Sequence, residues 1–419
     1  MITGKNNLRC GLIGKTLSHS FSPRIHGLLA DYSYKLFEMS ECEVGKFIRG
    51  GDFDALNVTI PYKKTVIPYL DEISEEARRI GSVNTVTRLS DGRLRGDNTD
   101  YFGFSYMLKK ANIAIEGKKV LILGTGGASL TAQAVCSDLG AREIVLVSRN
   151  GDVNYENVYE KHPDGEVIIN CTPVGMYPNN QVSPISLSRF SQLSGVADMV
   201  YNPATTELLF EAQSLKIPCT NGLSMLVAQA KRACELFLDT TIDNGVIDEI
   251  TAEIEKTTKN IVLVGMPGCG KSTVGAILSE MMGRKLVDTD EMISKSEGRD
   301  IPTIFNSDGE DYFRSAEHNA VAEAGKQSSL IISTGGGVVT RGENYRPLKQ
   351  NGVIFYIQRN INFLSRDGRP LSQNGDLEEM FQKRRPMYEA FCDYKVKNGT
   401  TAIDCAKEIL NIFRGGTDK

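Results

Sequence analysis

Residues 265–273 form a glycine-rich loop whose residue types and spacing suit a chain of phosphates. The run Gly-Met-Pro-Gly-Cys-Gly-Lys-Ser-Thr fits the pattern GxxxxGK[ST], with an apolar strand leading into it and an amphipathic helix (274–282) expected after it. Backbone N–H groups of such a loop wrap a phosphate at a helix N-terminus, where the dipole favours anions. The pattern predicts an ATP site, with Lys271 on the β- and γ-oxygens and Ser272 on Mg²⁺.

Two carboxylates follow this loop at a short distance in the sequence. An expected strand (285–287) ends in Asp288-Thr289-Asp290, which would place both carboxylates on one side of a strand. A carboxylate that faces a substrate hydroxyl can take up its proton during phosphoryl transfer. The run therefore predicts where the phosphate acceptor binds.

A second glycine-rich run, 124–129, reads Gly-Thr-Gly-Gly-Ala-Ser, with Ser129 where a dinucleotide-binding loop usually has its third glycine. A buried strand (119–123) precedes it and a helical stretch (131–139) follows, and this context favours a Rossmann-type site. The next strand leads to Arg149, where an NAD site usually presents Asp or Glu. A cation there suits the 2′-phosphate of NADP; the alternative is that Arg149 is an ordinary exposed turn residue.

The properties of the whole chain are those of a multidomain α/β protein. Its 419 residues exceed what one hydrophobic core usually holds, and short apolar runs alternate with longer amphipathic segments. The net charge is −4 and both signs are interspersed, so the sequence shows no cluster of positive charge that would indicate binding to nucleic acid or to an anionic membrane. We expect a cytoplasmic protein, because the N-terminus lacks a signal-peptide core, no window approaches a membrane span, and the nine cysteines include no CxxC pair.

The best domain boundary lies near residues 255–260. Segment 243–255 spaces its apolar residues like one helix face, the polar residues 256–259 follow, and a new strand begins at once. A second division is expected near 100–103, where a nucleotide-binding unit begins. Only 151–165 separate the Arg149 turn from the next strand, which is too short for a full crossover helix.

Further motifs follow the phosphate loop in a fixed order: DTD (288–290), GEDYFRSAE (309–317), STGGG (333–337), RPL (369–371) and RRPMY (384–388). Across residues 258–415 the sequence resembles shikimate kinase. The resemblance implies that Asp290 holds the shikimate hydroxyls and accepts the proton, with Lys271 as a second catalytic group, and that Asp288 joins Ser272 near Mg²⁺. The implied shikimate-binding residues are Asp290, Arg314, Gly335, Gly336, Gly337 and Arg384. The implied ATP-binding residues are Gly268, Cys269, Gly270, Lys271, Ser272, Thr273 and Arg369. Because only two residues separate Arg366 from Arg369, the lid is shorter than is usual in the family, and the role of Arg366 stays open.

The N-terminal part carries another ordered set: SHSFSP (18–23), NVTIPYK (57–63), GSVNT (81–85), GDNTD (96–100), NCTPVGM (170–176), DMVYNP (198–203) and NGLSMLVAQ (221–229). Across residues 8–254 the sequence resembles shikimate dehydrogenase, although Tyr101 stands where that family often has Gly. The resemblance implies that Lys63 and Asp100 form the catalytic pair. The implied substrate-binding residues are Ser20, Ser22, Thr59, Asn84, Tyr201 and Gln229, together with Asp100. The implied NADP-binding residues are Gly124, Gly126, Gly127, Ala128, Arg149, Met199 and Gly222.

The two resemblances together predict a bifunctional enzyme built from a substrate-binding part, a Rossmann-like NADP part and a P-loop domain with a parallel sheet. The expected boundaries are 1–255 for the dehydrogenase (1–100 and 220–255 for substrate, 101–219 for NADP) and 256–419 for the kinase. The expected reactions are reduction of 3-dehydroshikimate with NADPH and phosphorylation of shikimate with ATP and Mg²⁺. Two alternatives stay open: a metabolite sensor without turnover, and an NAD-dependent quinate/shikimate dehydrogenase joined to the kinase.

Three further side chains could be taken for reactive groups. We interpret His19 as a residue that orients its loop and His26 as part of a helix packing face. Cys269 lies in the phosphate loop at a helix N-terminus, a position that can activate a thiol, so we expect it to be sensitive to oxidation.

Overall fold

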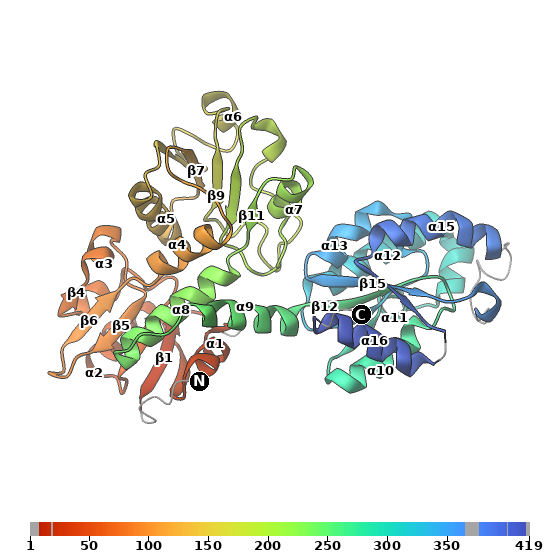
Figure 1. Ribbon diagram of the computed structural model, residues 1–419, viewed down its shortest axis with the longest axis horizontal. Helices are drawn as coiled ribbons and strands as arrows, with labels where there is room; N and C mark the ends of the chain where they lie inside the picture. The colour runs from red at the N-terminus through yellow and green to blue at the C-terminus, as the bar shows by residue number, and fades with distance from the viewer. Residues whose placement is uncertain (1–7, 18–19, 365–376, 400, 416–419) are drawn as a thin grey trace. The chain divides into compact units, whose positions relative to one another are not determined.

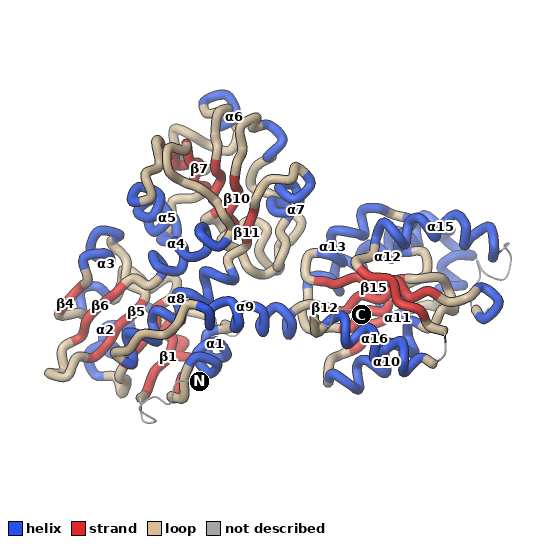
Figure 2. Tube along the Cα trace, in the orientation of Figure 1, coloured by secondary structure: helices blue, strands red, loops and turns tan. Residues whose placement is uncertain are grey.

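The computed structural model describes residues 8–17, 20–364, 377–399 and 401–415, which divide into two compact units (Figures 1 and 2). The first comprises Met1–Met176, Val182–Tyr201 and Thr206–Glu253, and the second comprises Tyr177–Gln181, Asn202–Thr205 and Ile254–Lys419. Helix α9 (Gly245–Thr258) begins two residues after the start expected for the helix at 243–255, and it continues through three of the four polar residues 256–259. Within the part of the chain just defined, no helix combines the length and the apolar composition that crossing a membrane requires.

The first unit begins with a mixed sheet of six strands in the order β2-β1-β3-β5-β6-β4. These strands are β1 (Arg9–Gly14), β2 (Ser33–Glu38), β3 (Ala55–Val58), β4 (Glu72–Ile73), β5 (Thr85–Arg88) and β6 (Leu94–Asp97). The helices beside them are α1 (Ser22–Leu29), α2 (Glu41–Gly50) and α3 (Glu75–Ile80). Helix α2 begins with a capping box between Ser40 and Glu43, and α3 ends at Gly81 in the left-handed conformation that glycine adopts without strain.

The expected packing role of His26 is confirmed within this sheet domain. The imidazole is 1% exposed, and its ring stacks on Tyr34 with centroids 4.1 Å apart. Its Nδ1 is hydrogen-bonded to the hydroxyl of Tyr32 at 2.6 Å. Burial lowers the pKa of His26 to about 3, so the ring is neutral at physiological pH and serves the core.

The second sheet of this unit is all parallel, with the order β11-β10-β9-β7-β8. Its strands are β7 (Lys119–Leu123), β8 (Glu143–Val147), β9 (Val167–Asn170), β10 (Gly195–Asp198) and β11 (Cys219–Thr220). Its helices are α4 (Asp100–Lys110), α5 (Gly127–Asp138), α6 (Val158–Lys161), α7 (Glu207–Ser214) and α8 (Leu223–Leu238). The stretch 151–165 holds only the single-turn α6, as its length predicts.

The C-terminal sheet is also all parallel, with the order β13-β14-β12-β15-β16. Its strands are β12 (Asn260–Val264), β13 (Leu286–Asp288), β14 (Ile331–Ser333), β15 (Gly352–Gln358) and β16 (Tyr394–Lys397). Its helices are α10 (Lys271–Met282), α11 (Thr289–Glu297), α12 (Ile301–Lys326), α13 (Tyr345–Lys349), α15 (Leu377–Phe391) and α16 (Ala402–Phe413), with α10 and α16 on one face and α12 and α13 on the other (Figure 1).

Two details of this sheet domain bear on its site. Asp288 ends β13, whereas Asp290 lies in the first turn of α11, so the prediction that both carboxylates share one side of a strand was wrong. The chain turns at Asp288 because its side chain caps α11 by accepting from the N–H of Asp290 at 3.0 Å. Helix α12 is interrupted at Gly309, whose φ of 83° is strained for other residues.

Candidate active sites

Lys63 and Asp100 form an ion pair at the carboxyl end of the first sheet. Lys63 lies in the turn after β3, and Asp100 is the first residue of α4. The Nζ of Lys63 donates to Oδ2 of Asp100 at 2.5 Å, with side-chain exposures of 22% and 12%. An ammonium group that is partly shielded and held by a carboxylate can donate a proton to an oxygen on which negative charge develops.

Asn84 holds the backbone next to Asp100 in place. Its Oδ1 accepts hydrogen bonds from the backbone N–H of Thr99 at 2.7 Å and from the hydroxyl of Thr85 at 3.1 Å. It is only 3% exposed, and Thr99 directly precedes Asp100. Asn84 thus fixes the turn from which Asp100 projects, whereas its predicted contact with a substrate hydroxyl stays a prediction.

The other predicted substrate residues come from separate segments of the first unit. Ser20 and Ser22 lie at the start of α1, where the Ser22 N–H donates to Oγ of Ser20 at 3.2 Å. The neighbouring ring of Phe21 lies 5.8 Å from that of Tyr201, which follows β10. The structure therefore brings the serines close to Tyr201.

Gln229 and Thr59 are positioned by glycines. A Cβ on Gly103 would lie 3.0 Å from Cβ of Gln229, so this glycine allows α4 to pack closely on α8. Gly103 is three residues after Asp100 and shares its helix face, which places Gln229 on the side of Asp100. A Cβ on Gly14 would lie 2.7 Å from Cγ2 of Thr59, so that residue is held against β1.

The glycine run after β7 is shaped to receive a dinucleotide. Gly124 has a φ of 99°, and a Cβ there would lie 2.9 Å from Cγ2 of Thr172. At Gly126 and Gly127 a Cβ would meet no atom within 4 Å, so this edge of the loop is open. Helix α5 begins with Gly127 and Ala128, and its free N–H groups are suited to a pyrophosphate.

The remaining predicted cofactor residues flank this loop. Arg149 is exposed in the turn after β8, where a 2′-phosphate could be reached. Gly222 packs on Met199, since a Cβ on this glycine would lie 2.1 Å from the Met199 carbonyl oxygen. These positions fit the group, and the contacts themselves stay predictions.

The sequence interpretation gave no role to Asp198, which the structure shows at the centre of a buried network. Its Oδ1 accepts from Nδ2 of Asn170 at 2.9 Å and from the N–H of Val200 at 3.0 Å, and its Oδ2 accepts from the hydroxyl of Thr206 at 2.6 Å. Asn170 in turn accepts from the N–H of Thr172 at 3.0 Å. Asp198 therefore connects the ends of β9 and β10 to Thr172, the residue whose side chain lies against Gly124.

We expect Asp198 to make stability depend on pH. Burial raises its pKa to about 6, above the usual value of 3.8, so between these values the folded state binds more protons than the unfolded state. Stability then falls as pH rises from about 4 to 6, because folding must keep an ionised carboxylate buried. The measurement is the free energy of unfolding of wild type minus that of Asp198→Asn, which should fall across this window and level off above it; a constant difference would contradict the assignment.

The phosphate loop of the second unit has the predicted form. Gly268 and Gly270 have φ of 79° and 101°, and α10 begins at Lys271. The Nζ of Lys271 donates to the carbonyls of Gly265 at 2.9 Å and Met266 at 3.1 Å, so the ammonium lies over the loop. Thr273 follows in the first turn and lines the same cavity.

An oxygen-rich position suited to Mg²⁺ adjoins this loop. Oγ of Ser272 donates to Oδ2 of Asp288 at 3.0 Å and lies 3.4 Å from Oγ of Ser333. Hydroxyl and carboxylate oxygens are the ligands that Mg²⁺ prefers. The residues present therefore fit the metal, which Ser272 and Asp288 would hold.

Cys269 differs from our expectation. Its side chain is 0% exposed, and its carbonyl accepts from Nδ2 of Asn398 at 2.8 Å. Oxidation of a thiol requires access for the oxidant. This burial argues against the predicted oxidation sensitivity, which stays a prediction, and Cys269 serves the loop through its backbone.

Two carboxylates face each other across a glycine in a cavity of about 400 Å³. A Cβ on Gly335 would lie 2.7 Å from both Oδ1 of Asp290 and Oε1 of Glu317, and neither of these two buried oxygens accepts a hydrogen bond from a residue that the structure describes. Burial, then the neighbouring Asp288 and Glu317, raise the pKa of Asp290 to about 6. The pair is suited to a substrate that brings hydroxyl donors.

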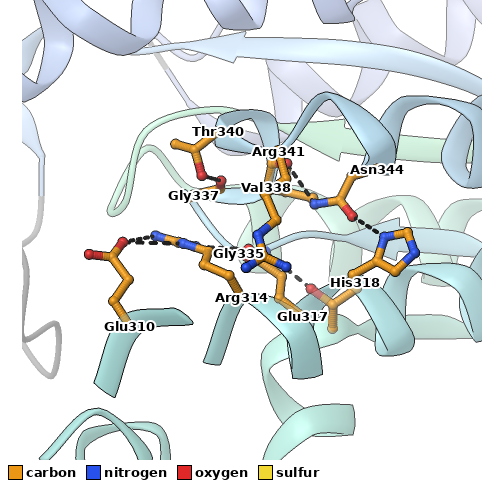
Figure 3. A network of polar contacts seen from close by, with 12 residues as sticks. Glu310, Arg314, Glu317, His318, Gly335, Gly337, Val338, Thr340, Arg341 and Asn344 are labelled. Carbon is orange, nitrogen blue, oxygen red and sulfur yellow. Dashed lines mark hydrogen bonds and ion pairs between the residues drawn. The ribbon is translucent and has the colours of Figure 1, made fainter. Parts of the chain in front are cut away.

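Two guanidinium groups lie in the same cavity. Nη1 of Arg314 donates to Oε2 of Glu317 at 2.8 Å, while its Nη2 donates to Oε1 of Glu310 at 3.0 Å (Figure 3). Nη1 of Arg384 donates to the carbonyl of Gly336 at 3.2 Å. Guanidinium groups pair bidentately with carboxylates, so the site can receive a small hydroxylated acid.

The glycines that follow β14 make room for these groups. A Cβ on Gly336 would meet the ring of Pro267 at 2.5 Å, and a Cβ on Gly337 would lie 2.1 Å from Nη1 of Arg314. Asn344 holds the next turn by donating from Nδ2 to the Val338 carbonyl at 2.8 Å (Figure 3). All three glycines thus permit close approach of the chain to the site.

We expect Gly337→Ala to weaken binding of the carboxylate substrate. The new Cβ would displace the Arg314 guanidinium, and loss of a charge-assisted contact should raise KM for the acid roughly tenfold, with KM for ATP little changed. Steady-state kinetics with each substrate varied would measure this. The matched control is Gly342→Ala, where a Cβ meets no atom within 4 Å; equal effects of both changes would contradict the argument.

Some predicted residues lie outside the described residues, namely Arg366, Arg369 and His19. Conversely, Glu317, Asn398 and Asp198 were missed as functional positions. Glu317 closes the motif GEDYFRSAE three residues after Arg314, and this helical spacing was the available signal. No pattern in the sequence pointed to Asn398, because it comes close to the phosphate loop only in the folded chain.

The fold and the two sites define a dinucleotide-dependent oxidoreductase joined to a P-loop phosphotransferase. Residues 12–86 match the family described as shikimate dehydrogenase substrate binding domain, and residues 267–414 match the shikimate kinase family. A Clostridium beijerinckii protein named shikimate dehydrogenase (NADP(+)) is 36% identical over 269 residues, covering 59% of this chain and 98% of the relative. The chain belongs to the shikimate dehydrogenase family, and its C-terminal part is a shikimate kinase domain, so it is a bifunctional enzyme of the shikimate pathway.

Solved structures agree with this assignment. Shikimate dehydrogenase 1 from Peptoclostridium difficile is 41% identical, with a TM-score of 0.54, and the match covers 59% of this chain and 97% of that one. A chorismate mutase/shikimate 5-dehydrogenase fusion protein from Clostridium acetobutylicum is 36% identical, with a TM-score of 0.56 over 61% of this chain and 98% of that one. The dehydrogenase fold is therefore confirmed by these structures, and the kinase domain in the same chain is confirmed by the family match at residues 267–414.

Proposed function

We propose that the chain reduces 3-dehydroshikimate to shikimate with NADPH and then phosphorylates shikimate to shikimate 3-phosphate with ATP and Mg²⁺. The observation that carries the proposal is that each site keeps its reactive pair: Lys63 against Asp100, and Lys271 within one cavity with Asp290. A sensor that binds without turnover would have no need of these groups.

In the first reaction the protein handles a proton and positions the substrate. Lys63 donates a proton to the ketone oxygen as negative charge develops there, and Asp100 keeps the ammonium oriented. Ser20, Ser22 and Tyr201 hold the carboxylate end, while Thr59, Asn84 and Gln229 hold the hydroxyls. When bound, NADPH supplies the hydride, and ATP with Mg²⁺ supplies the phosphoryl group of the second reaction.

In the second reaction Arg314 and Arg384 grip the carboxylate of shikimate. Its hydroxyls donate to Asp290 and Glu317, whose buried oxygens Oδ1 and Oε1 accept from no other described residue, and Asp290 takes the proton of the attacking hydroxyl. Lys271 neutralises negative charge on the β- and γ-phosphates, and Ser272 and Asp288 would hold Mg²⁺. Arg369 is proposed to close over the transferring group.

The domain division follows from these roles. We propose residues 1–255 as the dehydrogenase, with 1–100 and 220–255 binding substrate and 101–219 binding NADP, and 256–419 as the kinase. The preference for NADP over NAD is supported by the position of Arg149 and by the name of the Clostridium beijerinckii relative. A cytoplasmic location is supported by the nine cysteines, which are all free thiols.

A coupled assay with the purified chain tests the proposal. With 3-dehydroshikimate, NADPH, ATP and Mg²⁺, both NADPH consumption and formation of shikimate 3-phosphate are expected. Repeating the assay with NADH tests the cofactor preference, and quinate with NAD or NADP tests the broader alternative. Binding of shikimate and ATP without consumption of NADPH would instead support the sensor.

A further inference from the structure

Arg359 is a cation beside the phosphate loop that the roles above leave unused. It follows β15 directly, and β15 pairs with β12, the strand that leads into the loop. Nη1 of Arg359 lies 3.9 Å from the position of a Cβ on Gly270, and the residue lines the same cavity as Lys271. The guanidinium therefore lies next to the loop and within the nucleotide cavity.

The strand order separates Arg359 from the acceptor carboxylates. In the order β13-β14-β12-β15-β16, Asp288 and Asp290 follow the strand two places to one side of β12, whereas Arg359 follows its neighbour on the other side. The loop after β12 lies between them. A phosphate chain in this loop thus has the acceptor at one end and Arg359 at the other.

The charge of Arg359 is available to a ligand. Its side chain is exposed, and among residues 8–17, 20–364, 377–399 and 401–415 none forms an ion pair or hydrogen bond with it. Lys271, by contrast, donates to two loop carbonyls. A guanidinium has a fixed set of donors that matches phosphate oxygens, and it remains charged at all physiological pH values.

We propose that Arg359 binds the phosphates of the nucleotide that are not transferred, and so determines the affinity for ATP and for the product ADP. This assignment rests on the proposed kinase function. It gives Arg359 a role in positioning the nucleotide: it anchors the phosphate chain at the end away from the acceptor, while Asn398 holds the adjacent loop through the Cys269 carbonyl.

The test measures binding of ADP and of inorganic tripolyphosphate to the full chain by calorimetry. Arg359→Gln is expected to raise the dissociation constants of both about tenfold, because both contain the phosphate chain. Arg359→Lys should retain part of the affinity, since it keeps the charge but not the fork. KM for shikimate should stay unchanged, and the dehydrogenase rate of the same preparation reports that the chain is folded.

Arg385→Gln is the matched control, because it removes the same charge from an exposed arginine that pairs with Glu389. Weaker binding of ADP with unchanged binding of tripolyphosphate would place Arg359 on the nucleoside and overturn the proposal. Unchanged binding of both ligands would overturn it as well. Failure of the wild-type chain to phosphorylate shikimate would instead count against the kinase function and leave this comparison interpretable.

Discussion

Lys63→Ala is expected to lower kcat of the dehydrogenase reaction roughly a thousandfold, because positioned proton donors contribute about 10²–10⁴ to such reactions. Lys63 is the cation that the structure holds on Asp100, at 2.5 Å. Its removal also leaves the carboxylate of Asp100 without its counter-ion beside the developing negative charge. The measurement is NADPH consumption at saturating 3-dehydroshikimate.

The neighbouring residue provides the control for this prediction. Lys64 is exposed and carries the same charge, so Lys64→Ala should leave the rate within about twofold, as screened surface charges contribute little. Kinase activity on added shikimate should be unchanged in both variants. A Lys63→Ala enzyme with near wild-type kcat would assign the proton donor to another group.

Lys271→Ala is expected to have an effect of similar size on the kinase reaction alone. Removing a preorganised charge from the site of phosphoryl transfer costs about 10²–10³ in kcat. Lys271 is 8% exposed and begins α10 at the loop, so its charge acts in a shielded environment. Formation of shikimate 3-phosphate should fall accordingly, while NADPH consumption continues at the wild-type rate.

Lys285→Ala tests whether this loss is specific, because Lys285 is an exposed lysine of the same domain. It should leave kinase kcat unaltered. A parallel measurement of ADP binding separates the two roles of Lys271: a loss in kcat larger than the loss in affinity indicates action on the transition state. A loss of ADP affinity with kcat unchanged would show that the lysine only binds the nucleotide.

The sequence predicted those parts of the fold and the sites that depend on short, local patterns. The phosphate loop is local, since strand, glycines and helix follow one another within 260–282, and its geometry agrees with the prediction. The buried strand at 119–123 was found for the same reason, as was the next strand, at 143–147, which is only partly buried. The family resemblance then supplied the chemistry, which composition and periodicity alone do not contain.

The parts that were missed depend on contacts between distant residues or on one local competition. Asp290 was placed on a strand because the alternation of DTD was read without considering that Asp288 can cap a helix. The role of Asp198 could not be predicted, because its partners Asn170 and Thr206 come together with it only in the folded core. The burial of Cys269 likewise follows from tertiary packing, which local reasoning about a helix N-terminus does not include.

The buried carboxylates of Asp290 and Glu317 imply a trade-off between the stability of this domain and its catalytic rate. Among the described residues no donor reaches Oδ1 of Asp290 or Oε1 of Glu317, and burying two neighbouring carboxylates is unfavourable in the native state. Substitutions that relieve this tension would make the fold more robust and the enzyme slower. Selection for chemistry therefore holds these two positions away from the residues that stability alone would choose.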